Sequence, residues 1–237
     1  MFRRFLLIWI SLLILPALIT SASQKPAPEN FRYITSTVLQ PVYTPLAAEI
    51  AYKFNLAEKK GIAIDLGSGP GDLIIEFCRI TKNLHWVNAD INLDYFPGFI
   101  KRASDAGFGS RVSAMYADAV DLPFRDNYAE IIVSRGSFQI WEDLSKGLSE
   151  VYRVLRPGGT AYIGRGFSTD LPVEVAMNIR RKQNKDGKGL KYDVDETAEK
   201  MKSIMKELNI QDFSIIIPKP EGSENIKYGF CLEFHKN

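Results

Sequence analysis

The sequence predicts an α/β fold with a mostly parallel sheet and helices on both of its faces. From residue 44 onward, short apolar segments of strand length alternate with segments that have helical periodicity. The connections between them are short, apart from a long stretch at about 165–193 that suggests a lid or a mobile insert. A chain of 237 residues, 46% of them hydrophobic, is long enough for one such domain with a short appendage.

The composition excludes several other classes of protein. With 24% charged residues the chain is neither disordered nor collagen-like, and it is not a multi-span membrane protein. Cys78 and Cys231 are too few for a disulfide scaffold or a four-thiolate zinc site. A formal net charge of +2 argues against a protein that coats nucleic acid. We therefore expect no metal site and no nucleic-acid partner.

Residues 1–23 form a leader that differs from the rest of the chain. Arg3 and Arg4 precede an apolar run at 5–19, and small residues follow it. This layout predicts a cleaved signal peptide or, alternatively, an uncleaved membrane anchor. The two arginines would stay on the cytoplasmic side, which places the domain on the periplasmic or extracytoplasmic side, although a cytoplasmic face remains an alternative. Residues 24–32 are a polar linker, and 33–237 form the domain.

The helices and strands follow from the spacing of apolar residues. A helix is expected to start at Thr44-Pro45, because a hydroxyl caps a helix and proline suits its first position. The expected helices are 44–60, 71–80, 95–106, 144–155 and 194–208. The expected strands are 62–66, 85–89, 112–116, 130–134, 160–164, 213–217 and 228–234.

A glycine-rich turn directly follows the first strand. Asp65 precedes Gly67, Gly69 and Gly71, and glycine lets the backbone pass close to a ligand. The spacing G-x-G-x-G differs from the G-x-G-x-x-G that binds a dinucleotide pyrophosphate. An acid beside such a turn suits a ligand that carries positive charge.

Two further acids follow the second and third strands. Asp90 is placed to accept hydrogen bonds from both hydroxyls of a ribose. Asp118 is placed to accept one from an adenine amine, with Ile91 and Ala119 as apolar neighbours of the purine. All of them lie at the carboxyl ends of strands, where open α/β sheets bind ligands.

The chain resembles the class I S-adenosylmethionine-dependent methyltransferases of the small-molecule type. The matching segments are IAIDLGSGPG (62–71), NADI (88–91), ADAVDLPF (117–124) and VLRPGG (154–159), in this order over about 60–235. The resemblance implies a Rossmann-like, three-layer sandwich with a seven-stranded sheet whose last strand is antiparallel. It also implies S-adenosylmethionine as the cofactor and in-line methyl transfer to a small or lipid-like acceptor. Motifs and resemblance together give these cofactor-binding candidates: Asp65, Gly67, Ser68, Gly69, Gly71, Asp90, Ile91, Asp118, Ala119 and Ser134.

The acceptor side is less defined. Arg135 and Arg165 follow the fourth and fifth strands, where two arginines could bind a carboxylate or phosphate. The alternative is surface solvation or a salt bridge to Glu142 or Asp170. Trp141 is a candidate for an aromatic wall, with core packing as the alternative. His85 and His235 are expected at the opposite end of the sheet, so neither is a candidate general base.

A basic stretch at 180–191 predicts either a solvated loop or a membrane-surface patch. Together with residues 5–19, the second interpretation favours a lipophilic or membrane-associated acceptor. It leaves a conflict, because the cofactor is made in the cytosol whereas the leader directs the domain outward. A non-catalytic methyltransferase-like binding protein is the alternative function, which the intact Asp65 and Asp90 disfavour.

Overall fold

The computed structural model describes residues 38–185, 193–224, 226 and 228–237. The expected leader and linker, residues 1–32, lie outside this part of the chain. Seven strands form one sheet in the order β3-β2-β1-β4-β5-β7-β6. β7 lies between β5 and β6 and is antiparallel to both, while the other described neighbours are parallel. The predicted seven-stranded sheet with an antiparallel last strand is therefore confirmed. The strands are β1 (Lys60–Leu66), β2 (Asn83–Asp90), β3 (Val112–Tyr116), β4 (Ala129–Arg135), β5 (Leu155–Gly164), β6 (Phe213–Ile216) and β7 (Cys231–His235).

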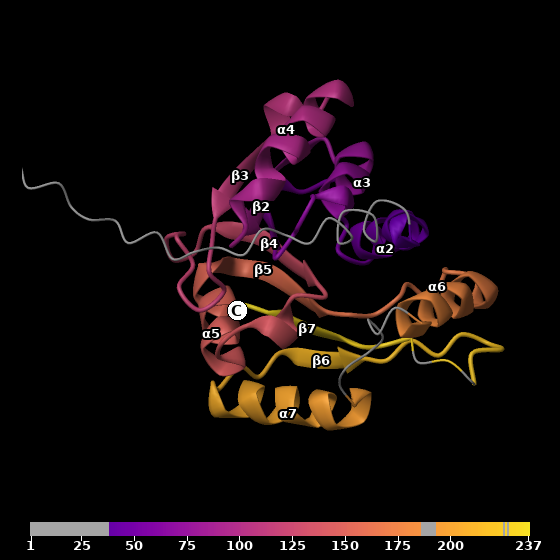
Figure 1. Cartoon of the computed structure of the whole chain (residues 1–237). Coiled ribbons are helices and arrows are strands. Elements are labelled where there is room, and N and C mark those ends of the chain that lie inside the picture. Colours follow the sequence, from indigo (N-terminus) through magenta and orange to yellow (C-terminus); the bar gives the residue numbers. More distant parts are fainter. Residues whose placement is uncertain (1–37, 186–192, 225, 227) are drawn as a thin grey trace, which may run out of the picture.

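Helices cover both faces of the sheet, which gives the three layers (Figure 1). α2, α3 and α4 lie on one face, whereas α5 and α7 lie on the other. α6 lies near the connection between β6 and β7. The bounds are α2 (Gln40–Lys53), α3 (Asp72–Ile80), α4 (Phe96–Asp105), α5 (Leu144–Val154), α6 (Val173–Lys185) and α7 (Val194–Glu207).

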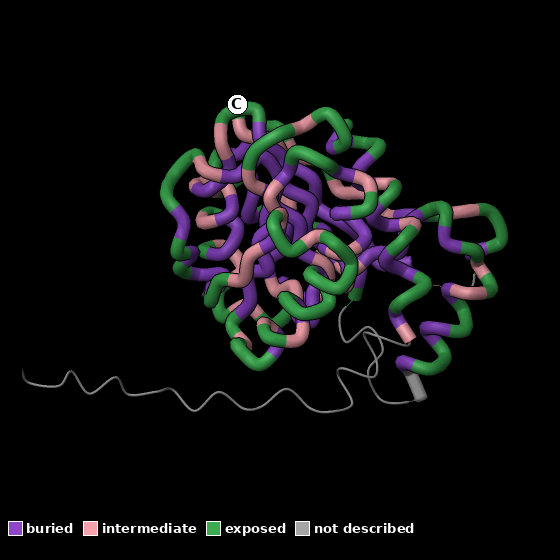
Figure 2. Tube along the Cα trace, turned by 90° about the horizontal axis from the view of Figure 1, so that it is seen from above, coloured by how far each residue is buried: buried purple, intermediate pink, exposed green. Residues whose placement is uncertain are grey.

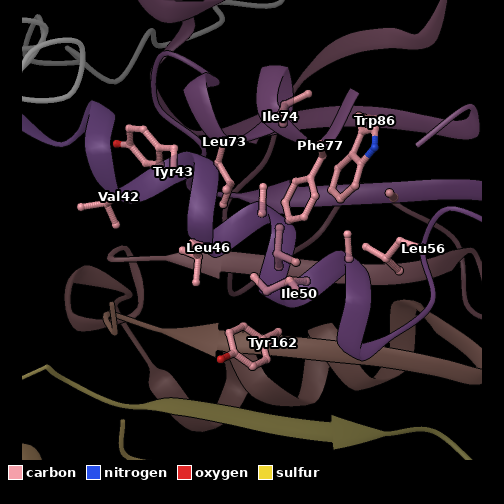
Figure 3. Packing of buried hydrophobic residues seen from close by; sticks show 14 of the residues in the cluster. Val42, Tyr43, Leu46, Ile50, Leu56, Leu73, Ile74, Phe77, Trp86 and Tyr162 are labelled. Carbon is pink, nitrogen blue, oxygen red and sulfur yellow. The ribbon is translucent and has the colours of Figure 1, made fainter. Parts of the chain in front are cut away.

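The apolar side chains form two clusters, one on each side of the sheet. Figure 2 shows the buried residues concentrated inside the molecule, with exposed residues around them. On the side of α2 and α3, the rings of Phe77 and Trp86 stack with centroids 4.3 Å apart (Figure 3). The indole Nε1 of Trp86 donates to the hydroxyl of Thr81 at 3.1 Å, which satisfies its buried polar atom. This packing fixes α3, and with it the turn that precedes α3.

Two expectations about helices are wrong. α2 begins at Gln40 with Pro41 in its first turn, so Pro45 lies inside the helix. The hydroxyl of Thr44 does not cap the helix but donates to Glu76 on α3 at 3.1 Å. The long connection at 165–193 also contains a helix, α6, in its middle part.

The basic stretch at 180–191 is described only as far as residue 185. The guanidinium of Arg180 lies 4.1 Å from the ring centroid of Phe167, and the side chain is buried. Arg180 is therefore not part of a solvated patch, whereas Arg181 and Lys182 are exposed. Within the described ranges, no helix is both long and apolar enough to cross a membrane.

Candidate cofactor and acceptor site

A cavity of about 600 Å³ lies at the carboxyl ends of β1, β2 and β4. It contains most of the predicted cofactor-binding residues and two of the acceptor-side candidates. The residues that line it are Leu66, Gly67, Gly69, Asp90, Ile91, Asn92, Tyr95, Asp118, Ala119, Arg135, Gly136, Ser137, Gln139, Ile140, Trp141 and Glu142. Segments that are distant in the sequence thus meet at one edge of the sheet, as expected for an open α/β fold.

Asp90 organises the glycine-rich turn. Its Oδ2 accepts a hydrogen bond from the backbone N–H of Gly69 at 2.7 Å, and its Oδ1 accepts one from Asn92 at 2.8 Å. Burial raises the pKa of Asp90 above its usual range, although both N–H groups oppose that rise by stabilising the carboxylate. An ionised carboxylate oxygen can accept more than one hydrogen bond. Asp90 can therefore hold the turn and still accept from ligand hydroxyls.

The glycines of the turn are required by different contacts. Gly67 and Gly71 have φ of +68° and +80°, and Cβ atoms there would lie 2.3 Å from Ser137 Cβ and 2.2 Å from Phe99 Cδ2, respectively. Gly69 has φ of +56° and lines the cavity. Gly71 does not line the cavity and is the residue before α3. It therefore allows the close packing of α3 against α4.

Asp65 lies behind the turn rather than in the cavity lining. It is 2% exposed, and its Oδ2 accepts a hydrogen bond from the hydroxyl of Ser68 at 2.8 Å. Burial raises its pKa to about 7, while the bond from Ser68 favours the carboxylate. Neither Asp65 nor Ser68 is among the lining residues, so their direct contact with a cofactor stays a prediction.

Asp118, the third predicted acid, accepts a hydrogen bond within its own loop. Asp118 Oδ1 accepts from the backbone N–H of Val120 at 3.1 Å, and Asp118 and Ala119 both line the cavity. Ile91 lines it as well and is 49% exposed. Asn92 and Tyr95 also line the cavity, although the sequence did not predict them as site residues.

A serine network joins β4 to the turn after β1. The hydroxyls of Ser134 and Ser137 are 2.6 Å apart, and Ser137 also donates to the carbonyl of Leu66 at 3.1 Å. Trp141 Nε1 donates to the Ser137 hydroxyl at 3.1 Å, which orients the indole at the cavity. Ser134 is buried below the lining, whereas Ser137 belongs to it. Ser137 was not predicted as a site residue, because it lies in no recognised motif.

The two predicted acceptor-side arginines are not equivalent. Arg135 lines the cavity, whereas Arg165 does not; its backbone N–H donates to the carbonyl of Phe230 at 3.0 Å. A joint grip by both arginines therefore has no support from the cavity geometry. His85 and His235 do not line the cavity either; they lie within hydrogen-bond distance of Ser113 and Thr160.

Comparison with known proteins gives a consistent result. Residues 64–163 match the model of a methyltransferase-domain family. The ubiquinone/menaquinone biosynthesis C-methyltransferase UbiE of Psychromonas ingrahamii is 37% identical over 109 residues, which are 46% of this chain and 43% of that relative. The same enzyme from Vibrio vulnificus is 37% identical over 97 residues, which are 40% of this chain and 37% of that relative. The chain thus spans less than half the length of these curated relatives.

Solved structures extend the likeness over nearly the whole chain. A protein of Methanococcus maripaludis, assigned as an S-adenosyl-L-methionine-dependent methyltransferase, is 28% identical with a TM-score of 0.77, covering 91% of this chain and 97% of that one. A SAM-dependent methyltransferase from Aquifex aeolicus, 14% identical with a TM-score of 0.61, covers 89% of this chain and 98% of that one, and supports the fold alone.

The sheet order, the motif order and these matches define the class I S-adenosylmethionine-dependent methyltransferases. Residues 64–163 match the methyltransferase-domain family, and the fold of the chain is similar to that of an S-adenosyl-L-methionine-dependent methyltransferase. The cofactor of the class is S-adenosylmethionine, and the lining residues fit it. Asp90 and Asp118 supply acceptors for hydroxyl and amine groups, and Gly69 brings the backbone close to a ligand.

Proposed function

We propose that this protein transfers the methyl group of S-adenosylmethionine to a small or lipid-like acceptor. One observation carries this proposal: a single cavity joins the two nucleoside-binding candidates, Asp90 and Asp118, to Arg135 and Trp141. When bound, the cofactor supplies an electrophilic methyl group on a sulfonium. The residues of the chain hold the acceptor in line with that group and exclude water, which accounts for much of the acceleration in such displacements.

The lining favours an acceptor that is itself nucleophilic. It contains carboxylates and a tyrosine but no histidine and no cysteine among the described residues. Asp90 and Asp118 are already engaged by backbone N–H groups, and Glu142, the other carboxylate of the lining, is exposed to solvent. We therefore infer that positioning dominates over general base catalysis.

Apolar side chains at the cavity favour the lipid-like end of this range. Ile140 is 78% exposed and Ile91 is 49% exposed, and both line the cavity beside Trp141. Large apolar side chains gathered at a cavity mouth are typical of sites for apolar ligands. The relatives named as ubiquinone/menaquinone C-methyltransferases support an aromatic, quinone-like acceptor as the first to test.

The decisive experiment is a labelled-methyl assay of the full chain against fractionated lipid and metabolite extracts, with cofactor binding measured by calorimetry. Asp90→Ala should abolish transfer and weaken binding, whereas Asp105→Ala, which removes an exposed acid on α4, should leave both unchanged. Cofactor binding without transfer to any fraction would contradict the enzymatic proposal and support a binding protein.

The location of the domain is a separate part of the proposal. We propose a membrane-anchored or exported domain, with membrane contact through residues 5–19 and 180–191. A compartment-sensitive reporter fused after residue 237 tests it. Reporter activity confined to the cytoplasm would contradict export.

A further inference from the structure

Arg135 lies at the part of the cavity next to β4, beyond the predicted cofactor-binding residues. Arg135 is the last residue of β4, where it pairs with Gly164 of β5, and it lines the cavity. Along the sheet edge, the predicted adenine, ribose and methionine contacts follow β3, β2 and β1 in turn. Because neighbouring strands are about 4.8 Å apart, Arg135 lies one strand beyond the glycine-rich turn. Because the predicted cofactor contacts follow β1, β2 and β3, we expect the acceptor to approach from the side of β4.

In the part of the chain that the structure describes, Arg135 has no ionic partner. The guanidinium lies 5.6 Å from the ring centroid of Tyr43 on α2, a buried ring of the core shown in Figure 3. Its Nε is buried without a hydrogen-bond partner, and among the described residues no carboxylate lies within ion-pair distance of it.

The groups close enough to interact with this charge do not neutralise it. Asp65, Tyr43 and Cys231 are all influenced electrostatically by Arg135. Burial raises the pKa of each of them, so the phenol and the thiol are neutral at pH 7, while Asp65, with a pKa of about 7, carries only part of a charge. The positive charge of Arg135 is therefore not fully compensated.

A half-buried guanidinium with an unsatisfied N–H is costly, and a bound anion removes that cost by charge-assisted hydrogen bonds. We propose that Arg135 binds an anionic group of the methyl acceptor: a carboxylate, a phosphate or an ionised hydroxyl. This inference rests on the proposed function and adds the chemical class of the acceptor to it. Trp141 lines the same cavity as Arg135, whereas Tyr43 is buried against the guanidinium, so an anion with an aromatic ring for Trp141 to contact is the first to test.

The first experiment separates the acceptor from the cofactor, which has a carboxylate of its own. Calorimetry compares S-adenosylhomocysteine with methylthioadenosine, which lacks the amino-acid part, on the wild type, Arg135→Gln and Arg135→Lys. The control is Arg181→Gln, because Arg181 is exposed and donates a hydrogen bond to Asn178 on its own helix. We expect the affinity of each ligand to be similar in all four proteins. A tenfold loss for S-adenosylhomocysteine alone, about the effect of one lost charged hydrogen bond, would overturn the proposal by assigning Arg135 to the cofactor.

The second experiment titrates protein saturated with S-adenosylhomocysteine with benzoate and phenyl phosphate, and with benzyl alcohol as the neutral counterpart. The wild type should prefer the anions by about tenfold or more, and Arg135→Gln should lose that preference while Arg135→Lys keeps part of it. A preference that is absent, or that survives in Arg135→Gln, would overturn the proposal. Retained binding of S-adenosylhomocysteine in the same samples distinguishes this failure from a failure of the proposed function, and shows that the variants are folded.

Discussion

The carboxylate of Asp90 and the backbone N–H of Gly69 are joined by a buried hydrogen bond of 2.7 Å, although they are 21 residues apart in the chain. The bond links the end of β2 to the turn after β1, and Asn88 strengthens the link by donating to the Gly69 carbonyl at 3.1 Å. A residue that the sequence assigns to ribose binding thus also shapes the neighbouring turn. Substitutions of Asp90 must therefore affect both the ligand and the loop.

Asp90→Ala should weaken S-adenosylmethionine binding and destabilise the unliganded protein. Loss of a carboxylate acceptor costs about 2–3 kcal/mol, which corresponds to roughly 30- to 150-fold in Kd. The Gly69 N–H would also lose its partner, so thermal unfolding without ligand should occur at lower temperature. Calorimetry and thermal melts measure the two effects, and an unchanged Kd would contradict the assignment of Asp90.

Gly67→Ala should impair both folding and cofactor binding, whereas Gly107→Ala should have a small effect. Both glycines have positive φ, +68° and +80°, so both substitutions carry a backbone cost of about 1 kcal/mol. Only at position 67 would the new Cβ collide with Ser137, at 2.3 Å; around Gly107 nothing lies within 4 Å. The difference between the two variants in denaturant melts therefore isolates the steric contribution. Equal stabilities would show that Ser137 can move away.

The sequence predicted the sheet well because its strands are short apolar runs bounded by glycine and polar residues. It missed α6 because few apolar positions define that helix; Ala176 and Ile179 are the buried ones. It placed the start of α2 too late because Thr44-Pro45 and Gln40-Pro41 both carry helix-start signals, and Thr44 is used in a contact with α3. Such tertiary contacts are not visible in local patterns.

The site was predictable where it depends on strand ends and not where it depends on loop geometry. Asp90 and Asp118 reach the cavity because parallel strands end at a common edge. Ser137 reaches it through the short 3₁₀ segment Phe138–Ile140 and its hydrogen bonds, which no spacing rule predicts. Arg165, although it directly follows β5, does not line the cavity, because a position after a strand does not fix the direction of a side chain.

Phe77→Ala should reduce the free energy of unfolding by about 3–5 kcal/mol, the usual cost of removing a buried aromatic ring. Phe77 is fully buried and stacks on Trp86, so its removal leaves a cavity inside the core. Tyr52→Ala on α2 is the control, since Tyr52 is 92% exposed and its removal should change stability by less than about 0.5 kcal/mol. Urea titrations of both variants test the expectation, and a loss below about 1 kcal/mol for Phe77→Ala would show that the stack contributes little.

Asp65 should make the stability of the unliganded protein depend on pH. Burial raises its pKa from the ordinary 3.8 to about 7. Between these values the folded protein retains a proton that the unfolded chain has released, so the free energy of unfolding falls as pH rises through this window. Asp65→Asn cannot titrate but keeps an acceptor oxygen for the hydroxyl of Ser68. The variant should therefore gain stability relative to the wild type as pH increases.

Urea titrations of the wild type and Asp65→Asn between about pH 4 and pH 8 measure this linkage. Asp105→Asn is the matched control, because Asp105 is exposed and its ion pair among the described residues is with Lys101 on the same helix. Its profile should run parallel to that of the wild type, while the difference between Asp65→Asn and the wild type should grow steadily up to about pH 7 and then level off. A constant difference across the range would mean that Asp65 is already ionised in the folded protein, and that its burial behind the turn is compensated by its surroundings.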